Sequence, residues 1–416
     1  MKTHTSLPPR RCFCKLEELR QAGFPLRPST HPTPAMPEPC VSVVPVPEPP
    51  AAALCVPLLS PQPRPSIIEQ LPYDILLTIS ESFKSDIDLI VFAAAVRITS
   101  SNIARTAETL DARLKRAIKQ SNINDISLLI NISKQTELTI WERVGSSGTI
   151  KLSKSLELNT SLRSLSLEGL SIRSDGVASL ARALIRNTTL ADLNIRGNLV
   201  GDDGAAHLGE MLTHNTVLTS LHLQGCQIQE EGAKALASAL KVNHSLKNLN
   251  LHLNTIGASG AKYIGEALTA NKTLECLDLS HNGISSDGAQ AISTGLGDNA
   301  ALQSLNLSIN HITDSGAQAI GQMLTKNTEL FRLALRSNGI SDKGVQHLYQ
   351  GLICNHSLLD LDLKGNFIGD AGLEWIVACL KQNSALVRVH LQSNNLSKSS
   401  TELIASTLME RLEVLL

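Results

Sequence analysis

The chain has few aromatic residues, almost no net charge and no long apolar run. Phe, Trp and Tyr make up 3% of its 416 residues while 42% are hydrophobic, so a buried core must be aliphatic. Its 37 Lys and Arg balance 38 Asp and Glu, which argues against a nucleic-acid binder, because such proteins carry a basic excess. No window approaches the ~18 unbroken apolar residues of a membrane span, so we expect no membrane association.

The cysteines lack the spacing of metal ligands. All eight are scattered, and Cys12 and Cys14 form the only close pair. Residues 1–11 contain no apolar run that could act as a secretion signal. We therefore expect reduced thiols in a cytoplasmic or nuclear protein, with no cofactor.

Proline is missing from most of the chain and concentrated at its beginning. Sixteen of the 17 prolines lie between Pro8 and Pro65, and none follows Pro72. Residues 1–66 are therefore predicted to form a disordered, Pro-rich arm. Residues 67–133 have apolar residues at helical spacing and are predicted to form a small helical segment.

The helical segment resembles an F-box. The residues that carry the resemblance are Leu71, Pro72, Ile75, Leu76 and Ile79, followed by Phe83, Asp88 and Leu89. The resemblance implies that the first five pack the helices and dock the Skp-type adaptor of a ubiquitin ligase. It fades where Ala94 to Ile98 lack the family's Trp. A helical spacer before the next domain is the other interpretation.

Residues 134–416 contain a repeat of 28 residues. The pattern is L-x-x-L-x-L-x-x-N-x-I, as in Leu274, Leu277, Leu279, Asn282 and Ile284. The nine units open at Leu162, Leu190, Leu218, Leu246, Leu274, Leu302, Leu330, Leu358 and Leu386. A degenerate unit precedes them, in which Gly148 and Asn159 keep the phase but the strand half around Leu138 is one residue out.

The period of the pattern changes within each unit and predicts its fold. The leucine half alternates with period 2, as a short strand does. The second half, such as Ala289 to Leu296, has apolar residues at helical spacing. Neither half can bury its apolar face alone, so neighbouring units must stack. We predict an α/β solenoid, a horseshoe with a parallel sheet on the concave face and helices on the convex face, in which Leu279 is buried.

Polar residues and glycine recur at fixed positions of the unit. Asn198 and its equivalents, replaced once by Cys226, are expected to satisfy backbone groups of the turn and of the next unit. Glycines such as Gly176 suit a positive φ or a close approach where the helix begins. The closing asparagines, such as Asn187, suit a left-handed helix cap. Acids such as Asp314 can cap their own helix.

The 28-residue unit with a helical half resembles the ribonuclease-inhibitor type of leucine-rich repeat, which also occurs in NOD-like receptors and in the Ran GTPase-activating protein. The resemblance is specific for the fold, which carries many binding tasks. No G-x-x-x-x-G-K-[ST] motif appears, as a NOD-like receptor would require. Arg173 and Arg196 lie in early units, but the sequence around the Ran activator's arginine and its acidic tail are missing.

Function is expected at the non-leucine positions of the strands. His252, Asp278 and His281 should lie close together, where an acid–base or metal site is conceivable, although solvated side chains are the other interpretation. The last third gathers aromatic and charged residues of the kinds found in binding hot spots. These candidate partner-binding residues are Phe331, Arg332, Arg336, Asp360, Asp362, Lys364, Arg388 and His390.

The end of the array departs from the pattern. Ser400 takes the glycine position and Arg411 the closing asparagine position. Because Leu412 to Leu416 are mostly apolar, we expect this tail to fold back over the last leucines as a cap; an exposed tail is the alternative.

The sequence as a whole predicts a non-enzymatic, monomeric platform for a protein partner with an acidic surface. Two alternatives stay open: an F-box-type substrate-recognition subunit of a ubiquitin ligase, and a GTPase-activating protein of the Ran type.

Overall fold

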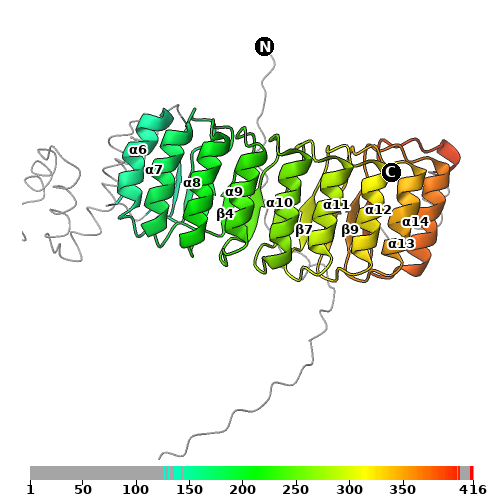
Figure 1. The fold of residues 1–416 in the computed structure, drawn as a ribbon. Coiled ribbons are helices and arrows are strands. Elements are labelled where there is room, and N and C mark those ends of the chain that lie inside the picture. The colour runs from blue at the N-terminus through cyan, green and yellow to red at the C-terminus, as the bar shows by residue number, and fades with distance from the viewer. Residues whose placement is uncertain are drawn as a thin grey trace, which may run out of the picture. The chain divides into compact units, whose positions relative to one another are not determined.

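The computed structural model describes residues 126, 130–131, 135–141, 144–400, 402 and 413–415. Within them the chain forms one parallel sheet whose strands follow one another in chain order from β1 to β11. Helices α6 to α14 stand side by side along one face of this sheet (Figure 1). The predicted Pro-rich arm and the residues of the F-box resemblance, from Leu71 to Leu89, lie outside the described residues.

Every described strand contains three residues. The strands are β1 (Glu137–Thr139), β2 (Ser164–Ser166), β3 (Asp192–Asn194), β4 (Ser220–His222), β5 (Asn248–Asn250), β6 (Cys276–Asp278), β7 (Ser304–Asn306), β8 (Arg332–Ala334), β9 (Asp360–Asp362), β10 (Arg388–His390) and β11 (Glu413–Leu415). The helices are α6 (Gly145–Leu156), α7 (Ser174–Arg186), α8 (Gly201–His214), α9 (Glu230–Leu240), α10 (Gly257–Ala270), α11 (Ser285–Leu296), α12 (Thr313–Leu324), α13 (Asp342–Leu352) and α14 (Asp370–Gln382). None of the described helices is long and apolar enough to cross a membrane.

The leucine pattern places the core as predicted. Leu274, Leu277, Leu279 and Ile284 are at most 2% exposed, and the equivalent residues of the other units join them in one continuous core. In each of β2 to β7 the middle residue is buried and its two neighbours are half-buried. The helices therefore cover one face of the sheet and leave the other face open.

The register of the sheet follows the 28-residue period. Leu165 pairs with Leu193, and each later strand up to β10 repeats this step. Leu138 pairs with Leu165, only 27 positions away, which confirms that the first strand is one residue out of phase.

The tail continues the sheet. Residues 413–415 form β11, which pairs in parallel with β10 through Val389 and Val414. This step is three residues shorter than a full unit, because 389 plus 28 would be 417. The sequence predicted a tail that folds back over the last leucines; the structure instead places residues 413–415 beside β10, as the next strand of the sheet. This strand covers the backbone edge of β10, which would otherwise present unpaired N–H and C=O groups.

The asparagine after each strand bridges two units. Asn282 donates from Nδ2 to the Leu251 carbonyl of the preceding unit at 2.9 Å and to its own unit's Leu279 carbonyl at 3.0 Å. Its own N–H donates to Oδ1 of Asn310 at 2.8 Å. Each side chain thus reaches back to the preceding unit, and the prediction that it would satisfy the next unit is wrong. The buried amides form a ladder along the array.

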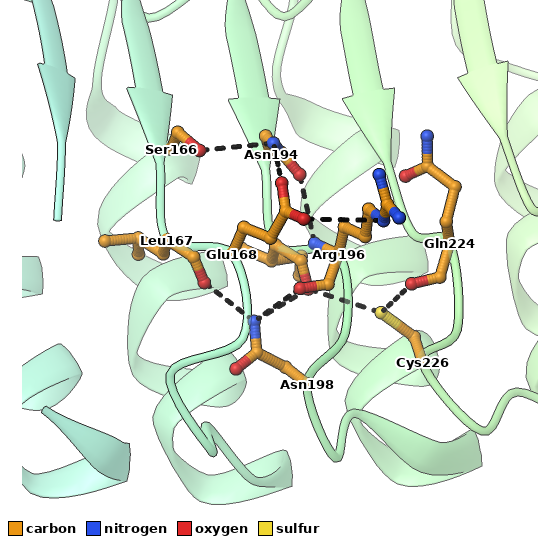
Figure 2. A network of polar contacts seen from close by, with 9 residues as sticks. Ser166, Leu167, Glu168, Asn194, Arg196, Asn198, Gln224 and Cys226 are labelled. Atoms are coloured by element: carbon orange, nitrogen blue, oxygen red, sulfur yellow. Dashed lines mark hydrogen bonds and ion pairs between the residues drawn. The ribbon is translucent and has the colours of Figure 1, made fainter. Parts of the chain in front are cut away.

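Cys226 interrupts this ladder (Figure 2). Asn198, one unit earlier, donates to the Leu167 and Ile195 carbonyls at 2.8 Å each. The Cys226 thiol donates to the Ile195 carbonyl at 3.3 Å and has only a 3.7 Å contact with the Gln224 carbonyl. Burial raises the pKa of this thiol to about 11, so it stays protonated and acts only as a weak donor.

The closing asparagines form a second set of bridges. The predicted left-handed cap is wrong: Asn187 has φ −71° and ψ 129°, which is extended backbone leading into the next strand. Its Nδ2 donates to the Leu156 and Asn159 carbonyls of the preceding unit, and its Oδ1 accepts from Leu190 N–H at 2.8 Å. Joining units, rather than ending a helix, explains its recurrence.

The acids near the helix starts also act between units. Asp314 was expected to cap α12, but that helix has no side-chain cap. Asp314 Oδ1 instead accepts a hydrogen bond from the backbone N–H of Ser341, at the start of α13, at 2.7 Å. Asp370 likewise accepts from Ser397 N–H in the next unit, and this hydrogen bond lowers the pKa of its carboxyl group. Carboxylates at helix N-termini are favoured by the helix dipole.

The recurring glycines permit close packing rather than a positive φ. A Cβ on Gly176 would lie 2.8 Å from Ile172 Cγ2, and no left-handed φ occurs there. A second glycine set lies between helices: a Cβ on Gly295 of α11 would lie 2.0 Å from the Gly265 carbonyl oxygen of α10. Helices α10 and α11 can approach this closely only because both residues lack side chains.

We predict that Gly295→Ala destabilises the array by about 1–3 kcal/mol, because the added methyl group forces α10 and α11 apart. Urea unfolding of the full chain measures the change. Gly297→Ala is the matched control. Gly297 follows the last residue of α11 with helical backbone, and a Cβ there would lie 3.7 Å from its nearest neighbour, the Thr294 carbonyl oxygen. The control should be neutral or stabilising by up to about 1 kcal/mol. Equal effects of the two substitutions would contradict the close helix contact.

We predict that Cys226→Asn raises the free energy of unfolding by about 0.5–2 kcal/mol, since it completes the ladder with a residue that the other units already use. Cys354→Asn, at an exposed cysteine, should change it by less than about 0.5 kcal/mol. Urea unfolding compares both variants with the wild-type chain. A less stable Cys226→Asn variant would mean that the cysteine site cannot accommodate the amide.

Candidate functional site

An ionic cluster on the open sheet face joins three adjacent strands. Asp360 of β9 accepts from Arg332 Nε and Nη2 of β8, both at 3.2 Å to Oδ2. Arg388 Nη1 of β10 lies 3.4 Å from the same oxygen, and His390 Nε2 lies 3.2 Å from Oδ1. We call Arg332, Asp360, Arg388 and His390 the ionic cluster. Four of the predicted partner-binding residues thus meet in one place.

Asp360 is the centre of this cluster. Its side chain is 12% exposed, against 55% for Arg332 and 34% for Arg388. Because a buried carboxylate needs opposite charge close by, the two guanidinium groups are held over it while their outer faces remain in contact with solvent. The cluster fixes two arginines in position on a solvent-facing surface.

The other predicted residues surround the cluster without joining it. Asp362 Oδ1 accepts from Lys364 N–H at 2.9 Å, which shapes the end of β9. Arg336 and Lys364 occupy position seven of adjacent units, where position one is the opening leucine. Among the described residues no ion pair joins either of these two side chains to a carboxylate. Phe331 is half-buried immediately before β8.

Sequence reasoning missed three apolar residues of this region. Phe367 occupies position ten of the unit that contains Lys364, and it is 64% exposed. Leu359 and Val387 are half-buried. They occupy position two of the two units that follow the unit of Phe331, which is also at position two. The signal was available, because earlier units place Arg163, Lys247 and Glu275 at position two.

The predicted His252, Asp278 and His281 group does come together. His252 Nδ1 lies 2.8 Å from Ser280 Oγ, and Ser280 Oγ donates to Asp278 Oδ1 at 2.5 Å. The rings of His252 and His281 meet edge to face at 6.3 Å. Here Ser280 lies between the carboxylate and the histidine, whereas in a hydrolytic triad the histidine lies between the carboxylate and the serine. Among the described residues no group of His, Cys, Asp and Glu has a metal-binding arrangement.

The early units carry a different polar surface. Arg196 Nε lies 3.5 Å from Glu168 Oε1 in the adjacent unit (Figure 2). Asp192 pairs with His222 at 3.3 Å and accepts from Ser164 Oγ at 3.1 Å. Arg173 directly precedes α7. Two side-chain pairs of this end therefore join neighbouring units, Glu168 with Arg196 and Asp192 with His222.

Comparison with family models finds the leucine-rich repeat seven times, at residues 186–209, 214–237, 242–265, 270–293, 298–321, 326–348 and 354–377. A comparison with curated proteins found no match.

Three solved structures illustrate the structural similarity. Actin-binding site 2 of leiomodin-1 is 25% identical over 31% of this chain and 75% of that chain, with a TM-score of 0.28. The Rad7 and Elc1 complex in yeast is 14% identical over 70% of this chain and 77% of that chain, with a TM-score of 0.40. The TLR13–ssRNA13 complex is 19% identical over 70% of this chain and 37% of that chain, with a TM-score of 0.43.

We predict that Asp360→Asn lowers the free energy of unfolding by about 1 kcal/mol, because it leaves two partly exposed arginines facing each other without their counter-charge. Asp362→Asn is the control, since an amide oxygen can still accept from Lys364 N–H, and it should change stability by less than about 0.5 kcal/mol. Urea unfolding at low and high salt measures both. The Asp360→Asn deficit should shrink as salt screens the arginines; a deficit independent of salt would contradict an ionic cause.

Proposed function

Because the chain is a leucine-rich repeat protein of the ribonuclease-inhibitor type, we propose that it is a non-enzymatic protein-binding platform whose partner docks on the open sheet face around the ionic cluster. Stacked repeats present a continuous surface whose side chains can vary without disturbing the core. The fold itself leaves the partner open. The choice of surface therefore rests on the residues of the last three complete units.

The observation that carries the proposal is the positioned excess of positive charge at the end of the array. Arg332 and Arg388 are held by one shared carboxylate, Asp360. Arg336 lies four residues after Arg332 in the same unit, and Lys364 lies four residues after Asp360 in the next unit. A partner with carboxylates on its surface would complement this region, since complementary potentials speed association and select the partner.

Pre-positioned arginines beside exposed aromatic residues are typical of binding hot spots. Phe367 is 64% exposed and lies three residues after Lys364 in the same unit. An arginine already held by Asp360 loses less side-chain freedom on binding than a free one. The combination favours a protein surface, which offers both carboxylates and apolar contacts, over a polyanion.

The two alternative functions remain predictions. The F-box interpretation depends on Leu71, Pro72, Ile75, Leu76 and Ile79, which lie outside the described residues. The Ran-type interpretation depends on Arg173 and Arg196, and the second of these is paired with Glu168. A pull-down with a Skp-type adaptor tests the first, and a GTP hydrolysis assay tests the second.

We predict that Arg336→Glu with Lys364→Glu weakens capture of the partner about ten-fold or more, because two attractive charges become repulsive. Affinity purification of the full chain followed by quantitative mass spectrometry measures this. Lys262→Glu with Lys381→Glu, an equal charge change on helices α10 and α14, is the control and should retain the same proteins. Partners lost equally from both variants, or from neither, would contradict docking at this surface.

A further inference from the structure

Position eight of every unit has a left-handed backbone. The early units place glycine there, with φ of 71° at Gly169, 69° at Gly197 and 61° at Gly225. The next three units place Leu253, His281 and Ile309 there, with φ of 57°, 57° and 58°. Side chains with a Cβ adopt this conformation only at a cost, and a β-branched residue such as Ile is a genuine outlier.

The stacking of units imposes this conformation. The N–H of Leu253 donates to the Ser280 carbonyl at 3.0 Å, and that of Ile309 donates to the Arg336 carbonyl at 2.8 Å. The next residue in each case is a ladder asparagine, buried and bonded to the preceding unit. Position eight therefore cannot relax to an ordinary φ without breaking contacts on both sides. Glycine would be the residue that fits without strain.

Burial does not explain the large residues at this position. Leu253 is 49% exposed and Ile309 is 39% exposed; His281 is also exposed. Three consecutive units thus place large, strained side chains in solvent. Strained residues that persist without a packing gain are typical of functional surfaces.

The charge pattern around these residues indicates what they would contact. We call Leu253 and Ile309, together with the imidazole ring of His281 between them in the unit order, the apolar rim. Positions seven, eight and ten of the same three units contain no Lys, Arg, Asp or Glu. Asp278, the charged side chain of β6 in the same units, accepts a hydrogen bond from Ser280 Oγ at 2.5 Å. The next two units carry Arg336 and Lys364 at position seven.

We propose that the apolar rim receives the apolar side chains of a partner protein segment whose following residues are acidic and reach Arg336 and Lys364. The inference rests on the proposed function and specifies the chemistry of the partner. Stacked strands are ~4.8 Å apart, so the four steps from Leu253 to Lys364 span about 19 Å. An extended segment of about six residues covers this length, with its apolar half on the rim and its carboxylates on the two cations.

Phage display of random peptides on the full chain tests this proposal. Enriched peptides should contain an apolar cluster followed by Asp or Glu, and their affinities are then measured for purified variants. Leu253→Gly with Ile309→Gly should weaken binding at least ten-fold. The same variant should unfold at an equal or higher urea concentration, because glycine removes the strain. A gain in stability with a loss of binding distinguishes a binding role from damage to the fold.

Gln227→Gly with Ser393→Gly is the matched control, because these residues also have left-handed backbones, with φ of 59° and 60°, but lie outside the rim. It should bind the peptides like the wild-type chain. Peptides that lose binding to the Arg336→Glu with Lys364→Glu variant but bind the rim variant normally would overturn the rim inference and leave the proposed function intact. Peptides unaffected by either variant, or none binding the wild-type chain at about 100 µM, would overturn both.

Discussion

The fold depends on the buried asparagine amide that ties each unit to the one before it. A three-residue strand followed by a turn leaves many backbone N–H and C=O groups without partners inside its own unit, and burying them unpaired would be costly. Asn282 and its equivalents satisfy carbonyls of two units with one amide. Because that amide must reach the preceding turn at the same place each time, successive strands from β2 to β10 are spaced 28 residues apart. Cys226 is the exception among these bridging residues, since its thiol, a weak donor, replaces the amide.

The same constraint separates structure from function within each unit. The leucines, the ladder asparagines and the packing glycines cannot vary without loss of stacking, whereas positions three, five, seven, eight and ten face the open side or its edge. The second group differs freely between units, whereas the first is nearly constant, with Cys226 as an exception. At the early end Glu168 pairs with Arg196, while the late end combines the ionic cluster with Arg336, Lys364 and Phe367. A partner would distinguish the two ends by these positions alone.

The sequence predicted the architecture because leucine phase and period are properties of residue spacing. It predicted the burial of Leu279 and the one-residue deficit near Leu138 for the same reason. Features that depend on which neighbour a side chain reaches were predicted wrongly: Asn187 bridges backward with extended backbone, and Asp314 bonds to the next helix start. Residue spacing also placed Arg332, Asp360, Arg388 and His390 near one another, but it could not show that Asp360 is the buried hub. The apolar rim was missed because the backbone conformation at position eight is not visible in residue spacing, whereas Phe367 could have been found from its place at position ten of its unit.

The apolar rim follows from the ladder by a simple chain of causes. The ladder holds position nine in place, and the N–H of position eight bonds forward to the next unit, so position eight is forced into the left-handed region in every unit. Stability alone would then favour glycine throughout, as in Gly169, Gly197 and Gly225. Leu253, His281, Ile309 and Ser337 depart from glycine in four consecutive units. The first three are large, their units carry no Lys, Arg, Asp or Glu at positions seven, eight and ten, and the next two units carry Arg336 and Lys364. A local preference that is broken in four consecutive units, with large side chains left exposed in the first three, is better explained by contact with another molecule than by the stability of this one.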